Sequence, residues 1–209
     1  MSWGLWISLY RGGNLSKEKF EKINIEDILR EDIYDIDSAD FGWQRDVESH
    51  SIISFGYIEA YKNTGDILIE NHEATDIMMF PIFFSYRQYL ELLLKELFRK
   101  KVNYDNELFS RFVHRVGHDL DKIWKETSDI VKEYLNEYNF KEKKINRFIE
   151  FFGKIIAIFA KLDPMSFNFR YPTDKQSNDS LNGSLHINFK HLKRAIEAID
   201  DIMYGVYGL

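Results

Sequence analysis

The chain has 209 residues, of which 44% are hydrophobic and 16% aromatic, so it can bury a sizeable core and is not a disordered tail. It contains no cysteine, which excludes disulfides and thiolate metal sites and favours a reducing compartment. The formal net charge of −6 argues against indiscriminate binding to nucleic acid, although a local basic site is compatible with it.

The first 48 residues are predicted to form an irregular N-terminal extension. Within it, residues 1–12 alternate loosely as a short strand does, and residues 25–48 are acidic and irregular. The start of the chain lacks the basic region of a secretory signal, and the best apolar run is broken at Arg87 and Glu91. We therefore expect a cytoplasmic protein without a membrane span.

From residue 49 to residue 209 the hydrophobic pattern is helical, so the sequence predicts one domain over this range. The pattern is less regular over 102–116, and the regular helices are predicted over 49–71, 76–101, 118–138, 141–162 and 187–206. In the first of them, Ile53, Tyr57, Ala60, Tyr61 and Leu68 are expected near one face. The predicted fold class is all-α, an antiparallel bundle of four to five helices.

Arg87, Glu91 and Lys95 form a charged line along the apolar helix predicted over 76–101, because a spacing of four residues places side chains on one face. Charges among apolar residues are costly unless they are paired. Two interpretations stay open. The line is either a partly exposed ladder of ion pairs, or one wall of a polar site that other elements complete.

His118 and Asp119 open the helix predicted over 118–138. Gly117 stands before them in a capping position, and Asp119 in the first turn complements the helix dipole. Helical geometry turns His118 away from the apolar stripe, so we expect an accessible imidazole, the group best suited to move protons near neutral pH. A merely solvent-exposed histidine is the alternative.

The stretch FRYPTDK, residues 169–175, lies in the loop predicted over 163–184. Pro172 restricts Tyr171 to extended geometry and so fixes the directions of Tyr171 and Arg170. Arginine is the preferred partner of carboxylate and phosphate groups. Arg170 is therefore expected either to pair with Glu91 or Asp119 and pin the loop to the bundle, or to bind a phosphate in a polar cleft that the loop closes.

Other patterns are weaker. The basic cluster of Lys141, Lys143, Lys144 and Arg147 is typical of a solvated helix face. His114 and His118 have the spacing of a metal site, but no carboxylate stands at a matching position, so neither a metal nor another cofactor is predicted. The sequence also lacks a P-loop, a G-x-S-x-G motif and a dinucleotide fingerprint.

Three segments, in this order, resemble the HEPN family of prokaryotic helical proteins. QYLELLLKEL, residues 88–97, is similar to that family's Q-x-x-E-x-x-x-K helix through Gln88, Glu91 and Lys95. GHDLDKIW, residues 117–124, is similar to its T-H-D-L-x-x-L helix start, with glycine where threonine is usual. FRYPTDK with the later FKHLKRAIEAIDDIM resembles its S-R-Y-P-D loop and final helix, so the resemblance covers roughly residues 50–206.

The resemblance implies an antiparallel helical bundle, usually a homodimer, of toxin–antitoxin, abortive-infection and other defence systems. Some HEPN members are metal-independent ribonucleases that attack through the RNA 2′-hydroxyl, using an arginine followed by a histidine in the last helix. Others bind nucleotides or a nucleotidyltransferase-type antitoxin. This sequence lacks that arrangement in its last helix, and its one spacing match, Arg111 to His118, precedes another helix and has Phe112 at the usual polar position.

Three hypotheses follow. The first is a HEPN-like metal-independent endoribonuclease in which His118 is the general acid or base and Arg170 stabilises phosphate. Its binding site would hold Arg87, Glu91, Lys95, Asp119, Tyr171 and Asp174. The second is a non-catalytic dimeric module that binds a nucleotide or a partner protein through the same cleft, which the missing motif favours. The third is a helical protein in which the charged line only fixes the packing.

Overall fold

The computed structural model describes residues 50–71, 75–173, 176–181 and 186–207. All of them belong to one compact unit of the chain, Arg45–Leu209. The extension expected over residues 1–48, with its strand-like start, lies outside the described residues, and so does Asp174.

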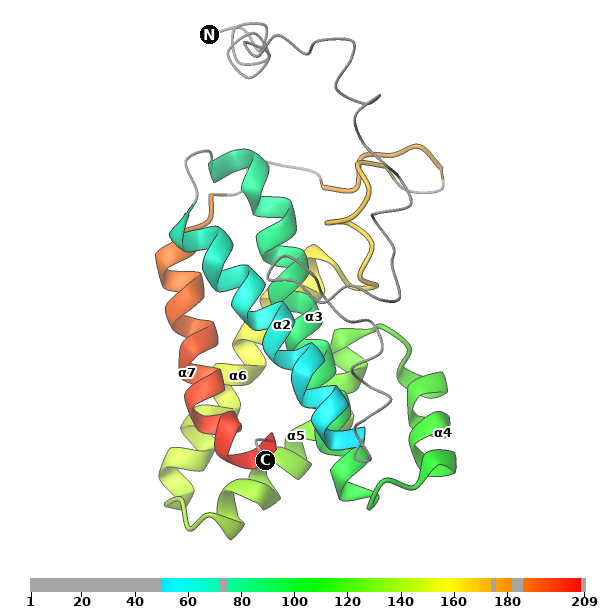
Figure 1. Cartoon of the computed structure of the whole chain (residues 1–209), viewed down its shortest axis with the longest axis vertical. Coiled ribbons are helices and arrows are strands. Elements are labelled where there is room, and N and C mark those ends of the chain that lie inside the picture. Colours follow the sequence, from blue (N-terminus) through cyan, green and yellow to red (C-terminus); the bar gives the residue numbers. More distant parts are fainter. Residues whose placement is uncertain (1–49, 72–74, 174–175, 182–185, 208–209) are drawn as a thin grey trace, which may run out of the picture. The chain divides into compact units, whose positions relative to one another are not determined.

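The described part of the chain is helical, with loops between the helices and one isolated bridge between Thr173 and Asp179. This confirms the predicted all-α bundle. Figure 1 shows the helices, which are α2 (His50–Glu70), α3 (Thr75–Lys101), α4 (Asn106–Val116), α5 (Leu120–Glu137), α6 (Glu142–Leu162) and α7 (Phe189–Tyr207). None of the helices in the described ranges is both long and apolar enough to cross a membrane.

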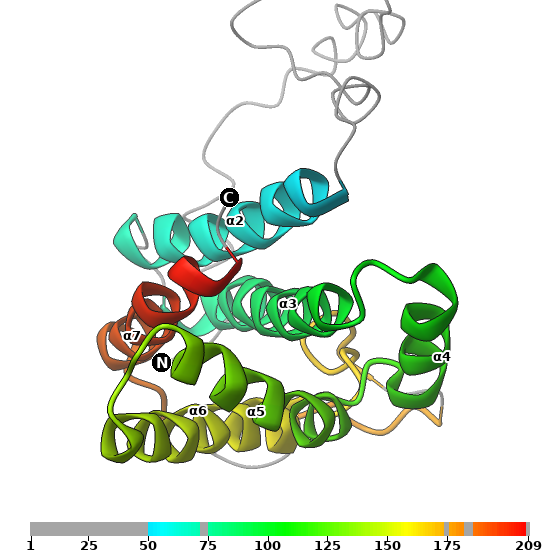
Figure 2. The ribbon, with the colours of Figure 1, turned by 90° about the horizontal axis from the view of Figure 1, so that it is seen from below.

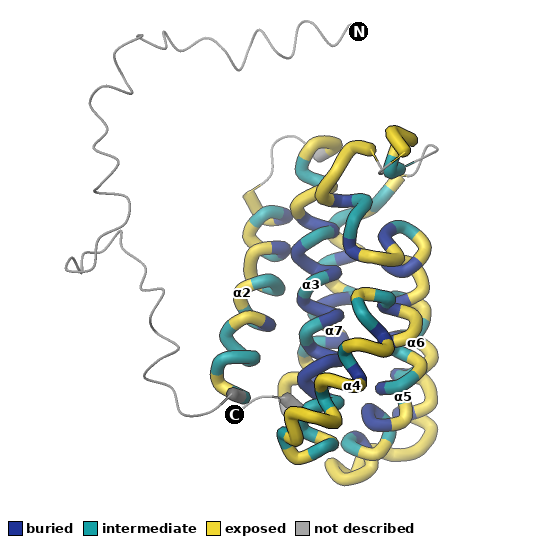
Figure 3. The backbone as a smooth tube through the Cα atoms, turned by 90° about the vertical axis from the view of Figure 1, so that its right-hand side faces the viewer, coloured by how far each residue is buried: buried dark blue, intermediate teal, exposed yellow. Residues whose placement is uncertain are grey.

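Helix α3 is the centre of the bundle. It contacts α2, α4, α5 and α7, and α5 packs against α6. Seen from below, α2 lies on one side of α3 and the hairpin of α5 and α6 lies on the other (Figure 2). Buried positions follow α3 along its length (Figure 3), because its apolar residues point to several neighbours at once. The fully buried ones include Phe83, Leu90, Leu93, Leu94 and Leu97.

Helix α2 agrees only in part with the predicted inward face, on which Tyr61 and Leu68 do pack against the core. Ile58 and Ile69 are buried, whereas Tyr57 is 46% exposed. The reason is Gly65, at which a Cβ atom would lie 2.5 Å from the Cε1 atom of Tyr86. The glycine that weakens the helical pattern therefore allows α2 and α3 to approach closely at this point.

The junction between α4 and α5 also differs from the prediction. Gly117 ends α4 with φ of 57° and ψ of −122°, a conformation that side chains with a Cβ rarely adopt. Asp119, and not Gly117, is the N-cap of α5, since its side chain accepts a hydrogen bond of 3.1 Å from the backbone N–H of Lys122. The helix consequently begins at Leu120, two residues later than predicted, and His118 lies in the turn between the helices.

Candidate functional site

The charged line of α3 is buried. The side chains of Arg87, Glu91 and Lys95 are only 0%, 3% and 11% exposed. The predicted i, i+4 ion pairs are formed, but the expected partial exposure of this ladder is wrong, so the charges must be satisfied inside the protein. They are satisfied by one connected set of groups, which we call the buried charged network: Arg87, Glu91, Lys95, His118 and Asp163.

All three nitrogen atoms of the Arg87 guanidinium group donate hydrogen bonds to neighbouring segments or to Glu91. Its Nη1 donates to Oε2 of Glu91 at 2.7 Å, and its Nε donates to the backbone oxygen of Asp163 at 2.8 Å. Its Nη2 donates to the backbone oxygens of His118 at 2.5 Å and Pro164 at 3.3 Å. The arginine thus joins α3 to the turn before α5 and to the segment after α6, and four of its five N–H donors are used inside the fold.

Glu91 is the acceptor at the centre of the network. Its second oxygen, Oε1, receives Lys95 Nζ at 2.7 Å and faces His118 Nδ1 at 2.8 Å. Burial by itself would raise the pKa of Glu91, but the charges and hydrogen bonds of Lys95 and Arg87 outweigh burial and hold this pKa below its ordinary value. Glu91 is therefore an ionised carboxylate at neutral pH and can only accept hydrogen bonds.

His118 is the member of the network that reaches solvent, since its side chain is 61% exposed. An ionised Glu91 requires a donor, so the Nδ1 atom of His118 carries a proton. In the neutral ring the lone pair then lies on Nε2, the other nitrogen. The result is an exposed imidazole held in one tautomer by a buried carboxylate, which is the arrangement of a general base.

Asp163 is the network residue that the sequence analysis missed. It is fully buried, and its Oδ1 accepts the backbone N–H groups of Phe167 and Asn168 at 2.5 and 2.9 Å. Its Oδ2 has no hydrogen bond but lies 3.5 Å from Arg87 Nε, so it balances the arginine by charge. The available signal was an aspartate placed directly between a helix end and Pro164, the position of a turn-capping side chain.

The FRYPTDK segment is anchored next to this network. Phe169 is buried, with its ring centroid 5.0 Å from that of Phe83. Arg170 is exposed, and its Nε donates to the backbone oxygen of Ser166 at 2.6 Å. The predicted pair of Arg170 with Glu91 or Asp119 is not formed, because Glu91 is bonded within the network and Asp119 pairs with Lys122 at 3.2 Å.

The two residues proposed from sequence as a catalytic pair lie at different levels of α3. The guanidinium carbon of Arg170 lies 5.8 Å from the ring centroid of Phe84, while His118 contacts Glu91. Phe84 and Glu91 are seven residues apart, which corresponds to about 10 Å along a helix. The structure therefore places His118 and Arg170 on one side of α3 but not within reach of one atom of a substrate.

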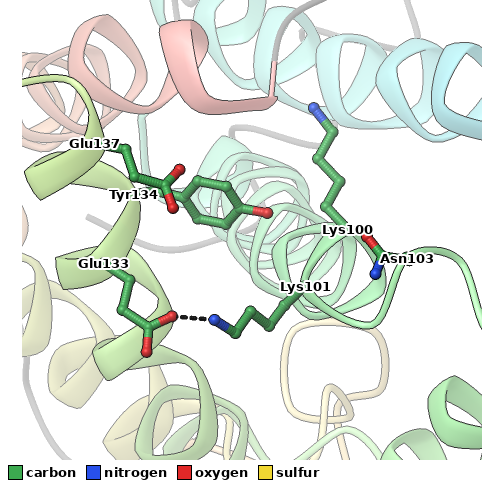
Figure 4. Close-up of a pocket in the computed structure, with 6 residues that line it drawn as sticks. All are labelled: Lys100, Lys101, Asn103, Glu133, Tyr134 and Glu137. Atoms are coloured by element: carbon green, nitrogen blue, oxygen red, sulfur yellow. Dashed lines mark hydrogen bonds and ion pairs between the residues drawn. The ribbon is translucent and has the colours of Figure 1, made fainter.

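The structure also contains a hollow that the sequence did not predict (Figure 4). It lies where the C-terminal end of α3 faces the second half of α5, and Lys101 forms an ion pair with Glu133 across it. Its lining consists of Lys100, Lys101, Asn103, Glu133, Tyr134 and Glu137. Two lysines and two glutamates offset one another, so the hollow has no preference for an anion or a cation.

The i, i+4 spacing of His114 and His118 does not produce a helical metal pair, since α4 ends at Val116. Within the described residues, no group of three or more histidine, aspartate or glutamate side chains is placed to hold a metal ion. The basic residues Lys141, Lys143, Lys144 and Arg147 are all exposed at the start of α6.

Comparison with known proteins gives no match to a family model, to a curated protein or to a solved structure.

Proposed function

We propose that this chain is a HEPN-like protein of prokaryotic defence or toxin–antitoxin type, and that it cleaves RNA without a metal, using His118 as the proton-transferring group. The observation that carries the proposal is the exposed imidazole of His118, fixed through Nδ1 to the buried carboxylate of Glu91 at 2.8 Å. A homodimer and a nucleotidyltransferase-type antitoxin partner belong to the same proposal.

The meeting of the three HEPN-like segments supports the family resemblance. Glu91 of the first segment contacts His118 of the second. Gln88 of the first donates to Ser166 Oγ at 2.6 Å, and Ser166 holds Arg170 of the third. Motif residues that are distant in the sequence are thus neighbours in the fold, as residues of one functional site are expected to be.

The chemistry follows from the tautomer of His118. Nε2 takes the proton of an RNA 2′-hydroxyl, and the 2′-oxygen attacks the adjacent phosphorus. The bond from phosphorus to the 5′-oxygen breaks, and that oxygen takes up a proton from solvent water, leaving a 2′,3′-cyclic phosphate and a 5′-hydroxyl. Glu91 stabilises the imidazolium that forms when Nε2 is protonated, because its charge lies next to Nδ1.

A ribonuclease assay in EDTA on total RNA and tRNA tests this role. The His118→Gln variant keeps a polar side chain of similar reach but cannot transfer a proton, so we expect it to lose at least a hundredfold in rate. His191→Gln, which changes an exposed histidine on α7, is the matched control and should cleave as the wild type does. Equal cleavage by wild type and His118→Gln would refute the role.

A non-catalytic module that binds a nucleotide or a partner protein is the second candidate. The observation that favours it is the burial of Arg87, whose guanidinium nitrogens all donate inside the fold, so that this arginine is not offered to a phosphate beside His118. A folded wild-type protein that binds RNA or nucleotide but cleaves nothing in EDTA would support this candidate over the first.

A further inference from the structure

We propose that Arg170, Tyr171 and Phe167, here called the arginine–tyrosine platform, bind one nucleotide of single-stranded RNA. The guanidinium would take a phosphate and the tyrosine ring would stack on a base. This inference depends on the proposed function for its ligand class, and it moves Arg170 from a catalytic to a binding role.

The Arg170 side chain is held by a hydrogen bond at Nε, whereas its two terminal nitrogens remain available. Its Nε is held by the backbone oxygen of Ser166 at 2.6 Å. Its guanidinium carbon lies 5.8 Å from the Phe84 ring and 5.7 Å from the Tyr171 ring, within the range of a cation–π contact. Neither terminal nitrogen has a hydrogen-bond partner in the described part of the chain, so the two are available for a bidentate contact with phosphate oxygens.

Tyr171 offers the stacking surface beside this cation. It is 49% exposed, and its ring centroid lies 4.7 Å from that of Phe167 with the planes 33° apart. Phe167 thus supports one face of the tyrosine ring and limits its movement. An exposed aromatic ring next to an arginine is the combination with which proteins bind unpaired bases and their phosphates.

Hydrogen bonds fix the backbone of the segment that carries the platform. Asp163 caps the N–H groups of Phe167 and Asn168, while the N–H groups of Arg170 and Tyr171 donate to the Phe167 oxygen at 3.0 and 3.2 Å. Ser166 adopts a left-handed φ of 59° and is buried against Gln88. On the other side, the Pro172 oxygen accepts the N–H of Ser180 at 2.9 Å. Because these hydrogen bonds already hold the backbone that carries Arg170 and Tyr171, less conformational entropy would be lost when RNA binds.

The position of the platform agrees with a single strand that also passes His118. The segment after α6 lies beside the first half of α3, and the turn before α5 lies further along the same side of α3 (Figures 1 and 3). The two sites are about 10 Å apart along the helix. A strand bound at Arg170 could therefore present a neighbouring phosphodiester to His118. Double-stranded RNA fits less well, since its bases are stacked and offer no free face to Tyr171.

The probe is a fluorescein-labelled 2′-O-methyl oligoribonucleotide, measured by anisotropy. Blocked 2′-oxygens prevent cleavage, so binding is read independently of catalysis. We expect Tyr171→Leu to weaken binding about tenfold and Tyr171→Phe to bind as the wild type does, because stacking needs the ring and not the hydroxyl. We expect Arg170→Gln to weaken binding about tenfold and to reduce the slope of log affinity against log salt concentration by about 0.7.

Arg194→Gln, an exposed arginine on α7, and Lys143→Gln, in the basic cluster of α6, are the controls and should leave affinity unchanged. Affinity lost in Lys143→Gln but retained in Arg170→Gln and Tyr171→Leu would overturn the inference and move RNA to α6. If His118→Gln abolishes cleavage but Arg170→Gln leaves RNA affinity unchanged, the platform is overturned and the catalytic role of His118 stands. Binding that depends on Arg170 without any cleavage would keep the platform and refute catalysis. No binding of the probe would refute the platform.

Discussion

Arg87 Nε donates to the backbone oxygen of Asp163 at 2.8 Å, which joins positions 76 residues apart in the chain. We expect Arg87→Met to lower the free energy of unfolding by about 3–5 kcal/mol, because Asp163 would stay buried without the cation beside it and Glu91 would lose one of its ion-pair partners. Urea unfolding followed by circular dichroism measures the loss. Arg111→Met, which removes an exposed i, i+4 pair with Glu107, is the control and should change little. A similar small change in both variants would contradict a stabilising network.

The lowered pKa of Glu91 predicts a pH dependence with a definite sign. Its carboxylate is favoured in the folded state, so its contribution is full above the unfolded value of 4.5 and is lost as pH falls through the lower, folded pKa. Glu91→Gln should therefore be less stable than wild type by about 2–3 kcal/mol at neutral pH. We expect the difference to shrink only below pH 4.5, as measured by urea midpoints at several pH values. A difference in free energy of unfolding between the two proteins that stayed constant down to pH 2 would show that the charge of Glu91 plays no part.

The bundle was predictable because helical periodicity is local. The stripe that includes Leu90, Leu93 and Leu97 marks α3 unambiguously, and the same residues are buried. The inward face of α2 was predictable only in part, because apolar residues surround that helix and the choice among them depends on the contact of Gly65 with Tyr86. The periodicity of one helix does not show which residue of another helix it will meet.

The charged line of the candidate site was also predictable, because the spacing of residues within one helix is local information. Arg87, Glu91 and Lys95 share one helix, so their spacing alone places them in a line. Whether that line is exposed or buried depends on Asp163 and His118, which lie on other segments. The partner of Arg170 could not be predicted from spacing. The sequence offered Glu91, but Arg87, only four residues from Glu91, binds that carboxylate.

The close approach of α2 and α3 gives a third prediction. In an exposed helix interior, Gly→Ala would stabilise by about 1 kcal/mol. At Gly65 the new methyl group would lie 2.5 Å from the Tyr86 ring, so we expect Gly65→Ala instead to destabilise by about 1–3 kcal/mol. Gly153→Ala in α6 is the matched control, because its nearest contact is Trp124 Nε1 at 3.1 Å and the required shift is smaller. Thermal unfolding compares the two variants, and a more stable Gly65→Ala would show that the helices are further apart.

Asp163 connects the network to the segment that carries Arg170, and its two oxygens can be tested separately. Oδ1 accepts the amide protons of Phe167 and Asn168, whereas Oδ2 balances the charge of Arg87. Asp163→Asn retains an acceptor for both amides, so we expect these protons to stay protected while stability falls from the loss of charge. Asp163→Ala removes the acceptor, so both protons should exchange about tenfold faster or more, since a hydrogen bond to a charged group contributes about 1.5–3 kcal/mol.

Hydrogen exchange followed by NMR at the amides of Phe167 and Asn168 measures this, with core amides of α3 as the reference for global unfolding. Faster exchange at these two amides and at the α3 reference alike would mean that Asp163 acts on the whole bundle. Faster exchange at the two amides alone would make Asp163 the residue that positions the Arg170 segment, and RNA affinity should then fall in Asp163→Ala but not in Asp163→Asn. That outcome would explain why a helix of this bundle ends on an aspartate: one carboxylate neutralises a buried arginine and also shapes the turn that presents an exposed one.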